Sequence, residues 1–129
     1  MSMPGSIPDP AAAQAAAARW LGCAGAVLAA GSVALSAYAS HGADRAGQAA
    51  LYVAAAIAFG HGIALAALSR FAARRLAMAS LAGLLLGTLL FSGGIVVAHF
   101  AGIPARAAPF GGTLLIVAWL AWAADTLRR

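Results

Sequence analysis

The sequence is short of charge, and of acidic residues above all. Its 129 residues include three acids, Asp9, Asp44 and Asp125, and none lies inside a long apolar run. Hydrophobic residues make up 64% of the chain, and the mean hydropathy is +0.92. A soluble domain of this length needs far more charge to cover its surface. The composition therefore excludes an ordinary soluble protein and indicates one whose partner is the lipid bilayer.

Cysteine is nearly absent as well. The single Cys23 excludes an internal disulfide and a cysteine-based zinc site, and its place in an apolar run predicts a small packing residue. Paired carboxylates, a Ser-His-Asp order, a P-loop and a glycine-rich nucleotide fingerprint are missing too. We therefore expect no enzyme activity and no cofactor, and we assign no metal ligands.

What the sequence does have is four apolar segments with the roughly 20 residues that a helix needs to cross a bilayer. They cover about residues 20–39, 48–69, 76–100 and 110–127, with short connectors between them. Connectors this short make consecutive helices antiparallel neighbours. The sequence thus predicts an all-α, polytopic membrane protein. Its membrane domain, residues 20–127, is expected to be an antiparallel bundle of four transmembrane helices, followed by a cytoplasmic end at 128–129.

All eight basic residues are arginine, and they form short clusters between the apolar runs. A nucleic-acid face needs instead a basic stripe interleaved with polar or aromatic residues, so we expect no nucleic-acid partner. Six arginines lie on one side of the predicted bundle and two on the other, which by the positive-inside rule predicts that both termini are cytoplasmic. Trp20, Trp119 and Trp122 are expected in an aromatic belt near the inner ends. The six arginines are Arg19, Arg70, Arg74, Arg75, Arg128 and Arg129, and the two are Arg45 and Arg106.

Residues 1–19 are expected to be a cytoplasmic tail and a helix extension. "MSMPGSIP" has the composition of a disordered tail, and Asp9–Pro10 resembles an N-cap followed by proline in the first helical position. This pattern predicts a helix continuous with the first span. "AYAS" at Ala37–Ser40 resembles a signal-peptide cleavage site, but a charged n-region is nearly absent, so we expect no cleavage.

Small residues at four-residue spacing predict where the helices pack closely. The third span carries Ala79, Gly83 and Gly87 in such a ridge, and two ridges in the second span flank His61. The paired glycines in "FSGG" predict a kink or local unwinding, with Ser92 bonding to any carbonyl freed by it. The glycines expected at helix contacts are Gly60, Gly62, Gly83, Gly87, Gly93, Gly111 and Gly112.

His61 lies well inside the second span, where an ionisable side chain is by default a candidate functional site. Its expected partners at comparable depth are Thr88, Ser92, Ser32 and backbone carbonyls, and no acid at that depth completes a proton relay. A neutral, hydrogen-bonded structural histidine and a histidine that handles a ligand or a proton both fit this pattern. We favour the structural role.

His41, His99 and Asp44 fall together at the predicted outer face. Neutral imidazoles suit zinc or copper, so an outer metal site is one interpretation of this group. These residues come from different segments and have no His-x3-His spacing. We therefore prefer residues at span ends, with His41 and Gly42 ending the first helix and Asp44 as a solvated loop charge.

Several motifs taken together resemble the YgdD-like proteins, small bacterial inner-membrane proteins of unknown function with a mitochondrial relative. The motifs are "GTLLFSGG", "PFGGTLLIVAW", "SAYASHG" and the histidine in the second span. The resemblance covers about residues 22–122 and implies a four-span protein of the bacterial inner membrane, but no reaction. The family carries a Tyr-Gln pair before this histidine, where the chain has Ile57 and Ala58, so any polar site around it is reduced here. The matching positions are His41, His61, Gly87, Thr88, Leu90, Phe91, Ser92, Gly93, Pro109, Gly111, Gly112 and Trp119.

These observations favour an accessory or assembly protein that packs against a larger membrane complex. The alternative is a homo-oligomeric carrier or channel for a small or lipidic solute, in which two copies complete a path that four spans cannot form alone. A third hypothesis is binding of haem or a metal through His61, His41 or His99.

Overall fold

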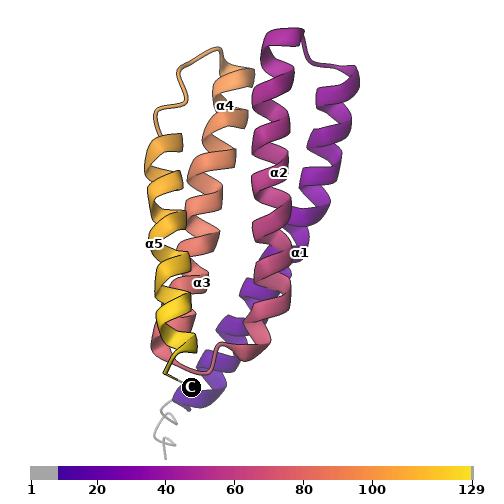
Figure 1. The fold of residues 1–129 in the computed structure, drawn as a ribbon. Helices are drawn as coiled ribbons and strands as arrows, with labels where there is room; N and C mark the ends of the chain where they lie inside the picture. The colour runs from indigo at the N-terminus through magenta and orange to yellow at the C-terminus, as the bar shows by residue number, and fades with distance from the viewer. Residues whose placement is uncertain (1–8, 129) are drawn as a thin grey trace, which may run out of the picture.

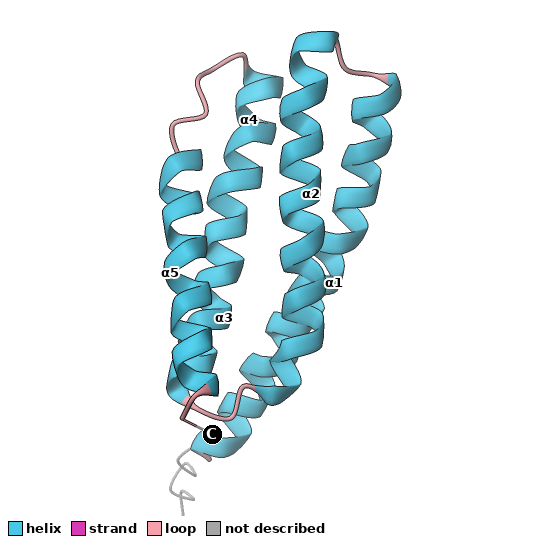
Figure 2. Cartoon of the chain, viewed as in Figure 1, coloured by secondary structure: helices cyan, strands magenta, loops and turns pink. Residues whose placement is uncertain are grey.

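The computed structural model describes residues 9–128, and within that range every regular element is helical (Figures 1 and 2). The expected tail at residues 1–8 and Arg129 lie outside the described residues. The first span is α1 (Pro10–His41) and the second is α2 (Arg45–Leu68), which ends in a short 3-10 turn, η1 (Ser69–Phe71). The third span consists of α3 (Arg75–Thr88), the π-helical segment η2 (Leu89–Gly93) and α4 (Gly94–Ala101), and the fourth is α5 (Ala108–Thr126).

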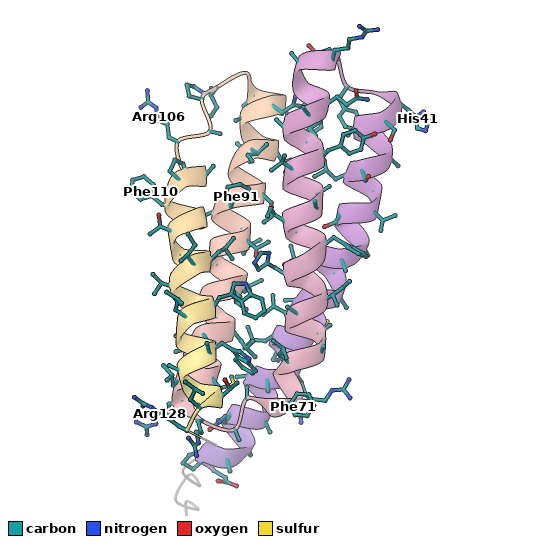
Figure 3. All side chains as sticks on the ribbon, viewed as in Figure 1. His41, Phe71, Phe91, Arg106, Phe110 and Arg128 are labelled. Atoms are coloured by element: carbon teal, nitrogen blue, oxygen red, sulfur yellow. The ribbon has the colours of Figure 1, made fainter. Side chains whose placement is uncertain are left out.

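Four of these helical stretches are long and apolar enough to cross a membrane, so the predicted four-span helical membrane fold is confirmed. Consecutive spans run antiparallel (Figure 1). The start of α1, the connection between α2 and α3, and the C-terminal end therefore share one end of the bundle. Arg128 at this end and Arg106 at the other mark the two faces in Figure 3.

The first span begins at an N-cap that its sequence explains. The Asp9 carboxylate accepts a hydrogen bond from the Ala11 backbone N–H at 3.0 Å, and Pro10 occupies the first turn, where its missing N–H costs nothing. The helix then continues without a break to His41. Residues 10–19 therefore extend the first span at the end of the bundle that carries most of the arginines.

The four spans form two helix pairs. α1 packs mainly against α2, whereas α3 and η2 pack mainly against α5. The first pair crosses at Gly25 and Gly62: a Cβ on Gly62 would lie 2.7 Å from the Gly25 carbonyl oxygen, so only glycine permits this approach. In the second pair, Gly83 packs against Ala118 and Gly87 against Leu115.

Two of the glycines expected at helix contacts do not lie at one. Positions where a Cβ would sit on Gly60 and on Gly93 have no described atom within 4 Å, apart from the helix's own backbone. The prediction was wrong for both because periodicity gives two candidate ridges on α2 and does not say which faces α1. The ridge that contains Gly62 faces α1, and Gly60 is exposed.

The predicted kink at "FSGG" is a π-helical turn, which widens the helix by one residue without breaking it. α5 approaches this turn closely at Gly111, where a Cβ would overlap the Phe91 backbone nitrogen and lie 2.7 Å from the Gly87 carbonyl oxygen. Gly112 makes ordinary contact with the Phe91 ring. The two spans therefore touch backbone to backbone at this point.

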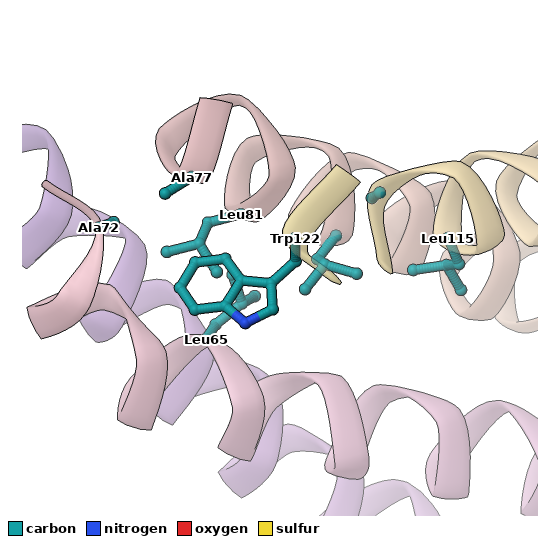
Figure 4. Packing of buried hydrophobic residues seen from close by; sticks show 8 residues of the cluster. Leu65, Ala72, Ala77, Leu81, Leu115 and Trp122 are labelled. Carbon is teal, nitrogen blue, oxygen red and sulfur yellow. The ribbon is translucent and has the colours of Figure 1, made fainter. Parts of the chain in front are cut away.

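The apolar core lies where the two helix pairs meet, toward the arginine-rich end (Figure 4). Trp122 is at its centre and is 8% exposed, so it is a core residue and not part of an interfacial belt. Trp20, by contrast, is 74% exposed on the surface of α1. The core residues are Leu65, Ala72, Ala77, Leu81, Leu84, Leu115, Ala118 and Trp122.

Candidate functional site

His61 is hydrogen-bonded at both ring nitrogens. Its Nδ1 lies 2.7 Å from the carbonyl oxygen of Ile57 on the same helix, and the indole nitrogen of Trp119 on α5 donates to its Nε2 at 3.1 Å. An indole N–H is only a donor and a carbonyl is only an acceptor, so Nε2 accepts and Nδ1 carries the hydrogen. The contacts thus define a neutral imidazole in a single tautomer.

The His61–Trp119 pair lies beside a pocket of about 350 Å³ between α2, η2 and α5. We call it the His61 pocket. Its remaining walls are almost entirely apolar, so the histidine contributes nearly all of its polar character. The lining residues are Ile57, His61, Phe91, Gly112, Leu115, Ile116 and Trp119.

The hydroxyl groups expected near His61 are bonded elsewhere. Thr88 donates to the carbonyl of Leu84, and Ser32 to the carbonyl of Leu28, each at 2.7 Å. Both are bonds within one helix, which short hydroxyl side chains form readily when no other acceptor is in reach. The predicted partnership of Thr88 and Ser32 with His61 was therefore wrong, whereas the backbone carbonyl was a correct alternative.

Ser92 is 5% exposed, and its hydroxyl has no hydrogen-bond partner in the described part of the chain. The expectation that it would bond a carbonyl freed by the paired glycines was wrong. The π-helical turn keeps its own hydrogen bonds, so it leaves less unsatisfied backbone than an unwound segment would.

The three outer residues are not arranged as a metal site. His41 ends α1 and projects away from the bundle (Figure 3). Asp44 caps α2, where its carboxylate accepts from the Gly47 N–H at 2.8 Å. His99 packs against Gly47 and meets the Tyr38 ring edge-on, with 6.2 Å between ring centroids. Among residues 9–128, no three histidine, cysteine or acidic side chains lie close enough to hold a metal ion.

Sequence reasoning missed Trp119 as the partner of His61, because it assigned the three tryptophans together to the membrane interface. A signal was present: a tryptophan in an apolar helix needs an acceptor for its N–H, and acceptors other than backbone carbonyls are few in these spans. Figure 3 shows ring side chains in the space between α2 and α5.

A second hollow lies on the other side of the molecule, between the outer halves of α1 and α2. We call it the serine groove. Ser32, Ser36 and Ser40 follow one another at four-residue spacing along its α1 wall, and the Ser40 hydroxyl lies 2.7 Å from the hydroxyl of Tyr52 on α2. The groove holds about 550 Å³. Its lining residues are Ser32, Val33, Ser36, Ala37, Ser40, Tyr52, Ala55, Ala56 and Phe59.

Comparison with protein families agrees with the expected placement in a small family of unknown function. The model of DUF423, described as "Protein of unknown function", matches residues 35–112, which is more than half of the chain. The match runs from the outer half of α1 through the start of α5 and includes His61 and Ser92. Neither the curated proteins nor the solved structures gave a match to the chain.

Proposed function

From the premise that the chain belongs to the DUF423 family, we propose that it is an accessory or assembly subunit of the bacterial inner membrane. In this proposal it packs against a larger membrane complex and binds one transmembrane helix of a partner in the serine groove. The observation that supports it most is the ladder of three serines, Ser32, Ser36 and Ser40, along a lipid-level groove of a multi-pass helical protein.

Hydroxyl groups are poorly matched to lipid tails and well matched to another helix. Ser32 and Ser40 donate to carbonyls of their own helix, but the Ser36 hydroxyl forms no hydrogen bond with any residue from 9 to 128. Small residues in the same groove, Ala37 and Ala56, allow a second backbone to approach closely. A partner helix with a polar side chain would therefore gain both packing and a hydrogen bond.

The first span is also the one least covered within the bundle. Only 11% of its most apolar window is buried, against 28–33% for the other three spans. Much of α1 is therefore available to lipid or to a partner, and the serine groove is the part of that surface with polar groups. The supporting role proposed here requires no catalytic residue.

A matched pair of alanine substitutions on α1 tests this proposal. Ala37 lines the serine groove and Ala30 does not, and both are exposed on the same helix. Tagged protein is purified from native bacterial membranes in mild detergent, and co-purifying proteins are identified. We expect Ala37→Leu to remove a reproducible membrane partner that Ala30→Leu retains. A wild-type protein that purifies alone would overturn the proposal, as would a partner retained equally by both variants.

A second candidate function, a carrier of a lipidic solute that acts as a homo-oligomer, draws support from the His61 pocket. An apolar pocket of about 350 Å³ with one imidazole fits a chain-like molecule that carries a single polar group. Binding of such a ligand would exchange the Trp119–His61 bond for a ligand bond and change the indole fluorescence. Reconstituted protein that shows neither this change nor flux of labelled lipid would remove the candidate. Metal binding through His41 and His99 has no comparable geometric support in the described residues.

A further inference from the structure

The first span is longer than a membrane requires. α1 has 32 residues, which at 1.5 Å per residue gives about 48 Å, whereas the hydrocarbon core is roughly 30 Å thick. About a dozen residues therefore extend beyond the core into the headgroup layer. Most of this excess is the stretch from Pro10 to Arg19, because Trp20 begins the apolar run.

This extension is tied to the connection between the second and third spans. The side-chain amide of Gln14 donates to the carbonyl oxygens of Ala72, at 3.2 Å, and of Ala73, at 2.7 Å. One helical turn beyond Arg19, Gly22 packs against the Ser69 hydroxyl so closely that a Cβ would lie 2.7 Å from it. Two segments that are far apart in the sequence thus form the walls of one structure.

Between these walls lies a pocket of about 500 Å³, which we call the arginine pocket. Alanines from both segments form most of its surface, and its charged groups are Arg19 and Arg70. No acidic residue is among the described residues that line it. The nearest acid in the sequence, Asp9, is used as the N-cap of α1. The Arg70 guanidinium also lies 6.0 Å from the centroid of the Phe71 ring, within range of cation–π attraction.

We propose that the arginine pocket binds the phosphate headgroup of an anionic phospholipid in the leaflet that faces the arginine-rich end of the bundle. Two guanidinium groups offer paired N–H donors whose geometry matches phosphate oxygens. The alanine walls offer an apolar surface for the glycerol and the first acyl carbons. The pocket lies at the depth where headgroups occur, which favours a lipid over a phosphate dissolved in the cytosol. This site lies at the opposite end of α1 from the serine groove and does not depend on the proposed partner.

The experiment measures lipid binding to the full-length protein. Native mass spectrometry of detergent-solubilised protein is carried out with phosphatidylglycerol and, in parallel, with phosphatidylcholine of the same acyl chains. We expect phosphatidylglycerol to bind more tightly. Replacing both pocket arginines (Arg19→Gln with Arg70→Gln) should weaken its binding about 25-fold, at about fivefold for each charge.

A matched double variant separates a built site from general electrostatic attraction. Arg74 and Arg75 lie at the same end of the bundle, but neither lines the arginine pocket. Arg74→Gln with Arg75→Gln removes the same charge and should leave phosphatidylglycerol binding within about twofold of wild type, since screened surface charges contribute little individually. Equal losses in the two double variants, or no loss in either, would overturn the proposal.

Two further arms identify the source of the phosphate group and the role of the clasp. Inorganic phosphate at the same concentration should not displace the lipid, and displacement would show that the pocket binds free phosphate instead. Gln14→Leu removes both bonds to the connecting segment and should weaken phosphatidylglycerol binding while all eight arginines remain. Unchanged binding in this variant would contradict a pocket that depends on the two docked segments.

Discussion

The Trp119 indole N–H donates to the Nε2 atom of His61 at 3.1 Å, and this bond links α5 to α2. The link matters because α5 otherwise packs mainly on α3 and η2, in the other helix pair. The histidine completes its hydrogen bonding with the Ile57 carbonyl, so both ring nitrogens are occupied. An imidazole satisfied in this way is suited to joining the two pairs inside an apolar environment.

Removing the indole donor is expected to weaken the bundle. Trp119→Phe keeps a ring but loses the N–H, which leaves Nε2 without its partner and should cost about 1 kcal/mol of unfolding free energy. The measurement is reversible unfolding in mixed micelles. Trp20→Phe serves as the control because Trp20 is 74% exposed. Equal losses of stability in the two variants would show that the bond contributes nothing.

The tautomer of His61 is a direct consequence of the two contacts. Nitrogen-15 NMR of histidine-labelled protein should show a neutral imidazole protonated at Nδ1, and Trp119→Phe should alter the Nε2 resonance most. His99 and His41 provide internal references, because no hydrogen bond to either ring is present among the described residues. A His61 protonated at Nε2 instead would contradict the arrangement.

Two neighbouring glycines on α2 should respond in opposite ways to alanine. Gly62→Ala places a Cβ 2.7 Å from the Gly25 carbonyl oxygen, so the helices must separate, at a cost of about 1–3 kcal/mol. Gly60→Ala places its Cβ in open space and should stabilise the helix by up to about 1 kcal/mol through propensity. Thermal unfolding in detergent compares the two. A Gly60→Ala variant less stable than Gly62→Ala would mean that the other face of α2 meets α1.

Ser92 offers a test of an unsatisfied buried hydroxyl. Ser92→Ala removes a polar atom that has no partner within residues 9–128, so stability should stay equal or rise by up to about 1 kcal/mol. Thr88→Val is the comparison, because the Thr88 hydroxyl donates to Leu84 and its loss should be destabilising. If Ser92→Ala lowers stability as much as Thr88→Val does, the serine hydroxyl has a partner in the membrane.

The orientation in the membrane follows from the arginines. We expect a green fluorescent protein fused after residue 129 to fluoresce, because the arginine-rich end should face the cytoplasm. Alkaline phosphatase inserted in the connection between α4 and α5, near Arg106, should be active, because that end faces outward. Active phosphatase at the C-terminus together with inactive phosphatase near Arg106 would reverse the proposed topology.

Much of the fold follows from composition alone. A chain this apolar with connectors this short has few arrangements other than an antiparallel bundle, and Asp9–Pro10 marks the start of α1 by local chemistry. Periodicity was a weaker guide to which face of a helix is buried, as Gly60 and Gly62 show. They belong to different ridges with the same spacing, and only the position of Gly25 on α1 distinguishes them.

The site was less predictable, because its contacts join residues far apart in sequence. His61 was identified from its apolar surroundings, but its partner lies 58 positions later, in a helix whose rotation the sequence does not fix. Thr88 and Ser32 have the right depth and the wrong orientation, since each donates to a carbonyl four residues earlier. Depth can be counted along a span, whereas rotation about the helix axis depends on packing against every neighbour.

The clasp formed by Gln14 also has a consequence for biosynthesis. Its acceptors are carbonyls 58 and 59 residues further along the chain, so they do not exist when the first span leaves the ribosome. The extension can dock only after the second span and the turn that follows it have been synthesised. Docking of Gln14 therefore marks completion of the first hairpin, and it does so before the third span has emerged.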